Sequence, residues 1–122
     1  MILVDTSVWL DHFARSDEQL NDLLRGRQVL VHPFVIGEIA MGSMRQRLIM
    51  LEELQALRKP NVATDDEVLD FVGRHGLFGR GIGYIDAHLL ASVRLTIGST
   101  LWTRDRRLLT AAQSLSIAAD LK

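Results

Sequence analysis

The chain has 122 residues, of which 48% are hydrophobic and two are prolines, with no cysteine and a formal net charge of -1. This length suits one domain with a buried core over residues 1–122, and the composition argues against intrinsic disorder, disulfides, thiolate metal sites and a global positive field. No apolar stretch approaches the ~18 residues of a membrane span, and no basic segment precedes the apolar start as in a signal peptide, so we expect a cytoplasmic protein.

The first predicted element is a strand over residues 2–4. Its continuous apolar run is typical of a strand in a parallel sheet that helices cover on both faces. Asp5 follows this strand directly, and Thr6 or Ser7 is suited to cap a short helix after it. We therefore expect the chain to turn from strand to helix at Asp5.

The rest of the sequence alternates helical and strand-like stretches. A capping box at residues 16–19 predicts a helix that ends in a left-handed Gly26, and Pro33 is suited to the first turn of a later helix. Further helices are predicted over 34–41, 45–57, 64–76, 84–95 and 105–115. Further strands are predicted over 29–31, 100–102 and 116–118, with a glycine-rich loop over 76–83. This alternation predicts an α/β fold with a mainly parallel central sheet flanked by helices in three layers.

Three aspartates fall where an open parallel sheet gathers its ligands, outside the carboxyl ends of the strands. Asp5 follows the first strand, Asp86 lies in the first turn of the helix after the glycine loop, and Asp105 sits at the N-cap of the last long helix. Asp86 and Asp105 also have an ordinary explanation, because acidic residues favour helix N-termini. Strand propensity does not explain Asp5.

A fourth acid, Glu38, is expected to emerge from an apolar helix face, because Phe34, Val35 and Met41 stand at helical spacing from it. A carboxylate in such a place is costly to bury without a cationic partner. That partner is either a divalent cation or an arginine, and the residues alone leave both open.

Together the four acids predict an all-oxygen site for magnesium or manganese, since the chain has neither cysteine nor a paired-histidine zinc motif. Such cations support phosphoryl chemistry, because they activate water and neutralise the phosphate. Arg80 precedes Asp86 and Arg104 precedes Asp105, which favours a phosphate-bearing substrate; solvated surface arginines are the alternative. The four histidines show no ligand spacing, and we assign none of them to catalysis.

Four blocks of this sequence resemble those of PIN-domain nucleases, and in particular the VapC toxins of bacterial and archaeal toxin–antitoxin pairs. The blocks are residues 4–9, 37–39, 84–91 and 101–105, and the resemblance spans residue 2 to about residue 112. It implies a Mg2+- or Mn2+-dependent endoribonuclease, a homodimer, held inactive by a cognate VapB-like antitoxin whose tail enters the acidic groove.

The resemblance also assigns roles to individual positions. Asp5, Glu38, Asp86 and Asp105 match the acidic quartet of the family, which implies that they bind metal and carry catalysis. Thr6 and Thr103 match neighbouring hydroxyl positions that orient the acids or water, and we expect them to contact substrate with Arg80 and Arg104. Some members carry a further aspartate two residues after the fourth acid, where this chain has Arg107, so the number of metal ions stays open.

We therefore predict hydrolysis of RNA phosphodiesters, with Asp105 completing the metal shell or orienting water. An α/β phosphatase or receiver domain is a weaker alternative, because Asp5 is followed by Thr6-Ser7 instead of the required Asp-x-Asp pattern and no lysine is suitably placed. A non-enzymatic module whose acidic groove receives a basic peptide is the other alternative. For the dimer, Leu48, Leu51 and Leu54 offer an apolar surface.

Overall fold

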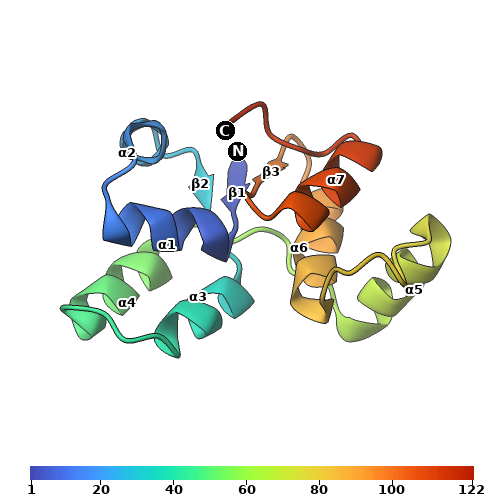
Figure 1. The fold of residues 1–122 in the computed structure, drawn as a ribbon, viewed down its shortest axis with the longest axis horizontal. Coiled ribbons are helices and arrows are strands. Elements are labelled where there is room, and N and C mark those ends of the chain that lie inside the picture. The colour runs from blue at the N-terminus through green and yellow to red at the C-terminus, as the bar shows by residue number, and fades with distance from the viewer.

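The computed structural model describes residues 1–122 and contains three strands and seven helices (Figure 1). The elements are β1 (Ile2–Val4), α1 (Thr6–Ala14), α2 (Glu18–Arg25), β2 (Val29–Leu30), α3 (Pro33–Ala40), α4 (Arg47–Ala56), α5 (Asp65–His75), α6 (Tyr84–Leu95), β3 (Thr100–Trp102) and α7 (Arg106–Ser114). None of the helices combines the length and the apolar character that crossing a membrane requires.

The sheet is fully parallel, with the order β2-β1-β3, so β1 is the central strand. Figure 1 shows α1, α3 and α4 to one side of β1 and α5, α6 and α7 to the other. Leu3 and Val4 are completely buried, as expected for a strand that is covered on both faces. The predicted α/β class and its flanked parallel sheet are confirmed.

The predicted strand over 116–118 is wrong, because only an isolated bridge between Leu101 and Ala118 forms there. Ser116 has a positive φ of 58°, so the chain is still turning out of α7 when it reaches the edge of the sheet. Two backbone hydrogen bonds, from Leu101 N to Ile117 O and from Ala119 N to Leu101 O, are all that remain of the pairing.

Several helix ends differ from the sequence predictions for local reasons. Asp17, not Ser16, caps α2 by accepting a hydrogen bond from Leu20 N, and the left-handed residue after this helix is Arg27 instead of Gly26. A left-handed Gln46 delays the start of α4. The capping box at the start of α5, its left-handed end at Gly76 and the bounds of α6 are confirmed.

The predicted apolar face of α4 contributes less to the core than its leucines suggest. Leu54 is buried, whereas Leu48 is 73% exposed and Ile49 is also exposed. The helix therefore packs on α3 and also presents apolar side chains to solvent. The use of this surface in a dimer stays a prediction.

Candidate active site

Asp5 is positioned by the last step of the central sheet and the first turn of α1. Its backbone N–H donates to Trp102 O at 2.9 Å, which extends the β1–β3 pairing by one residue. Asp5 is also the N-cap of α1, with its side chain accepting from Ser7 N at 3.3 Å. The expectation that Thr6 or Ser7 would cap this helix is wrong, because the last residue with extended backbone is Asp5 itself.

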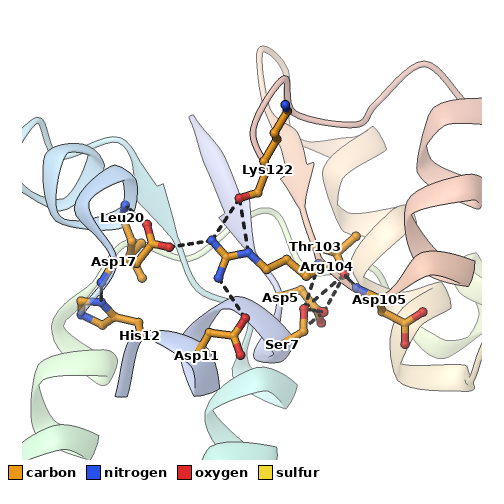
Figure 2. A network of polar contacts seen from close by, with 10 residues as sticks. All are labelled: Asp5, Ser7, Asp11, His12, Asp17, Leu20, Thr103, Arg104, Asp105 and Lys122. Atoms are coloured by element: carbon orange, nitrogen blue, oxygen red, sulfur yellow. Dashed lines mark hydrogen bonds and ion pairs between the residues drawn. The ribbon is translucent and has the colours of Figure 1, made fainter. Parts of the chain in front are cut away.

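Hydroxyl groups fix the Asp5 carboxylate through one of its two oxygens (Figure 2). Oδ2 accepts from Ser7 Oγ at 2.7 Å and from Thr103 Oγ1 at 2.8 Å, in addition to the Ser7 amide. The side chain is only 6% exposed, yet Oδ1 has no hydrogen-bond partner. Sequence reasoning treated Ser7 only as a helix cap and missed this contact, although a hydroxyl two residues after a strand-end acid was the available signal.

Thr103 joins Asp5 to Asp105. Its hydroxyl donates to Asp5 Oδ2 and accepts from Asp105 N at 3.0 Å. Asp105 caps α7, as predicted, with Oδ1 accepting from Arg107 N at 3.0 Å and Leu108 N at 3.1 Å. The Asp105 side chain is exposed, and its Oδ2 has no protein donor.

Glu38 lies in a different environment from the one its sequence predicts. It is exposed, because α3 buries Val35 and Ile39 and leaves the side with Phe34 and Met41 largely open to solvent. It forms no ion pair with an arginine, and Thr6 Oγ1 donates to Glu38 Oε1 at 2.7 Å. The heavy desolvation expected at Glu38 is therefore absent.

The acid whose charged form is disfavoured by burial and by neighbouring negative charges is Asp86. It is half-buried, and its Oδ2 accepts from Gly83 N at 3.0 Å. Burial raises the pKa of the Asp86 carboxyl, the Gly83 N–H lowers it, and the negative charges of Asp5, Asp105 and Glu38 raise it further. The structure thus brings all four predicted acids into one electrostatic cluster, and no basic side chain is among the causes of the shift.

The donor set of this cluster suits a hard divalent cation. Each acid uses one oxygen for a protein donor and leaves the other oxygen without one; the free atoms are Asp5 Oδ1, Glu38 Oε2, Asp86 Oδ1 and Asp105 Oδ2. No three Asp, Glu or His side chains converge closely enough to enclose an ion. Oxygen ligands with uncompensated negative charge are those that Mg2+ and Mn2+ prefer.

Arg104 is engaged by the protein itself (Figure 2). Its guanidinium donates to Asp11 Oδ2 at 2.9 Å, to Asp17 Oδ2 at 2.6 Å and to the Lys122 carbonyl oxygen, and it lies 5.2 Å from the centre of the Trp102 ring. The hydrogen bond from Arg104 lowers the pKa of Asp17. These contacts join α1, α2 and the end of the chain, and the contact of Arg104 with substrate stays a prediction.

Two other arginines stand at the glycine loop. The Arg107 side chain packs against Gly81, where an added Cβ would lie 2.6 Å from a guanidinium nitrogen, and the φ of 77° at Gly81 also favours glycine. Arg80, one residue earlier, forms no ion pair or hydrogen bond through its side chain. Arg80 thus keeps its guanidinium free for a phosphate, and that role stays a prediction.

Two buried histidines support the helices that carry Glu38 and Asp86, namely α3 and α6. His32 caps α3, with Nδ1 accepting from Phe34 N at 2.9 Å, and His88 Nε2 lies 3.0 Å from Asp65 Oδ1. Their rings are edge to face at 6.0 Å. Burial, and secondarily the neighbouring His88, lowers the pKa of His32 to about 4, so His32 is neutral near pH 7.

The chain is similar in sequence to known proteins. The family model described as PIN domain matches residues 2–113, a span that includes all four acids. The chain is also 49% identical over 118 residues to the protein named Ribonuclease VapC32 of Mycobacterium tuberculosis, in strains CDC 1551 / Oshkosh and ATCC 25618 / H37Rv. The matched segment covers 97% of this chain and 95% of each relative.

We predict that His32 makes the fold acid-sensitive. Its pKa in the folded protein is about 4, against 6.5 in an unfolded chain, so only the unfolded state takes up this proton as the pH falls from 6.5 to 4. The loss approaches about 3 kcal/mol of unfolding free energy by pH 4. Urea unfolding between pH 6.5 and pH 4 measures this loss in the parent and in His32→Asn, a variant that retains a capping side chain but has no imidazole to protonate. Stability curves that stay parallel over this pH range contradict the prediction.

We predict that Arg104→Gln lowers the free energy of unfolding by about 1–2 kcal/mol, because Asp11, Asp17 and the Lys122 carbonyl all lose a charged donor. Urea denaturation at pH 7 measures the change, with Arg25→Gln, which breaks only a surface ion pair with Asp22, as the control. Equal stability of Arg104→Gln and the parent contradicts the assigned role.

Proposed function

The chain belongs to the PIN-domain family, and we propose that it is a metal-dependent endoribonuclease toxin of the VapC type that hydrolyses RNA phosphodiester bonds. The proposal rests on the family match together with the identity to a protein named as a ribonuclease over nearly the whole chain. It treats residues 1–122 as one nuclease domain.

One observation carries the proposal from family to site. Burial raises the pKa of the Asp86 carboxyl, and the negative charges of Asp5, Asp105 and Glu38, which come from separate parts of the chain, raise it further. Three carboxylates near Asp86, with no basic partner, disfavour its charged form unless a cation neutralises them. A groove that only bound a basic peptide would not require one oxygen of each acid to be held by the protein and the other left free.

We propose that Asp5, Glu38 and Asp86 hold Mg2+ or Mn2+ through their free oxygens and that Asp105 completes the shell or orients water. Such a cation, when bound, activates water and neutralises the phosphate. The protein supplies the orientation. Ser7 and Thr103 fix Asp5, and the remaining acids are held by Thr6, by the Gly83 amide and by the first turn of α7.

The roles proposed for Arg80, for the two threonines and for Asp105 follow from the same arrangement. Arg80, free of ion pairs, is suited to contact the RNA backbone next to Asp86. Thr6 and Thr103 act by orienting Glu38 and Asp5, in agreement with the 2.7 Å and 2.8 Å hydrogen bonds that they donate. The exposed Asp105 is accessible to an incoming water molecule.

We further propose that a VapB-like antitoxin and a second copy of the chain are its protein partners in the cytoplasm. The VapC name of the relatives supports an antitoxin partner. The exposed apolar side chains of Leu48 and Ile49 on α4 support a surface that another protein covers.

We predict that Asp5→Asn, Glu38→Gln and Asp86→Asn each lower the cleavage rate of single-stranded RNA in Mg2+ by at least about 100-fold, because each removes a charged ligand that stabilises the transition state. Asp70→Asn is the control, since Asp70 lies on α5 in a surface pair with Arg74. Gel-resolved cleavage and circular dichroism measure activity and folding. Parental cleavage by a folded Asp5→Asn variant sinks the proposal, as does a parent that cuts no RNA and only binds a basic peptide.

A further inference from the structure

A hollow of about 300 Å3 opens on α3 directly beside the acids. Its lining residues are Pro33, Phe34, Gly37, Glu38, Met41 and Ile85. Glu38, one of the four clustered acids, forms part of its wall, and Ile85 precedes Asp86 in the chain. The hollow therefore adjoins the acidic cluster at Glu38.

The lining of the hollow suits a flat, uncharged group. Phe34 is 39% exposed and Met41 is 88% exposed, and no basic side chain takes part in the lining, so a phosphate has no counter-charge there. The Phe34 ring packs against the buried rings of His88 and His32, with ring centroids 4.7 Å and 5.1 Å away, respectively. A fixed aromatic ring next to adaptable aliphatic side chains is the kind of surface on which nucleobases stack.

Gly37 keeps the hollow open. A Cβ built on this residue meets nothing within 4 Å, so close packing does not require glycine here. Within a helix, glycine costs about 1 kcal/mol relative to alanine. Any larger side chain at this position would project into the hollow between Phe34 and Met41.

We propose that this hollow is a nucleobase subsite that receives a base next to the scissile phosphate; this rests on the proposed ribonuclease function. A base is covalently tied to its phosphate, so a base adjoining the cut must lie within one nucleotide of the acids. At about 300 Å3 the hollow is at the lower end of ligand pockets, which fits one base. A peptide helix needs a longer groove with several anchor positions.

The test compares two RNA substrates that differ only in one abasic nucleotide, placed in turn at each position flanking the cut. We expect the parent to cleave the base-bearing RNA with a kcat/KM on the order of tenfold higher at one of these positions. In Gly37→Leu, which fills the hollow, the ratio of kcat/KM for the base-bearing RNA to kcat/KM for the abasic RNA falls to near one. Gly73→Leu is the matched control, since this helical glycine of α5 also has nothing within 4 Å, and it keeps the parental ratio.

A second variant guards against a general effect of the added leucine. Phe34→Leu keeps an apolar side chain but removes the ring, and it lowers the same ratio by about threefold or more. Thermal unfolding checks that each variant is folded. If the parent cleaves the base-bearing and the abasic RNA equally well at every position, the subsite is overturned but the ribonuclease proposal is not. The same holds if folded Gly37→Leu keeps the parental ratio of kcat/KM for the two RNAs, even if this variant binds a protein partner less tightly. A parent that cleaves neither RNA overturns the ribonuclease proposal, and the subsite falls with it.

Discussion

The hydrogen bonds to Asp5 Oδ2 connect the parts of the molecule on which the site depends. Ser7 approaches this oxygen from α1 and Thr103 approaches it from the end of β3, so the central strand, a helix and the neighbouring strand meet at one atom. Thr103 also accepts the Asp105 amide, which ties the position of the fourth acid to that of the first. A carboxylate that is 6% exposed tolerates burial because these donors stabilise its charge.

Among the four acids, Asp86 is the one whose charged form is most disfavoured by its surroundings. Glu38 and Asp105 are exposed and Asp5 is well supplied with donors, whereas Asp86 is half-buried, has a single backbone donor and feels the charge of all three. A bound cation stabilises a carboxylate most where the surroundings have raised its pKa, so the charged form of Asp86 is stabilised more by a cation than the other three acids are. The sequence pointed to Glu38 for this role, and the structure moves it to Asp86.

The predictions that the structure confirms depended on short stretches of sequence. The apolar run of β1, the capping box of α5 and the bounds of α6 depend on residues close in sequence, and all were found. The Glu38 prediction failed because spacing alone does not reveal which side of a largely apolar helix faces the core, and α3 uses Val35 and Ile39. Arg104 meets Asp11, Asp17 and Lys122 only in the folded chain, so its protein partners had no signal in the sequence.

A crystal of the protein soaked in Mn2+ and measured for anomalous scattering tests the central claim, that free oxygens of the clustered acids hold a divalent cation. We predict an anomalous peak roughly 2.0–2.3 Å from Asp5 Oδ1 and Asp86 Oδ1, with Glu38 or Asp105 bound directly or through water. Ordered, unliganded carboxylates at millimolar Mn2+, or a manganese peak bound only by other residues, would contradict it.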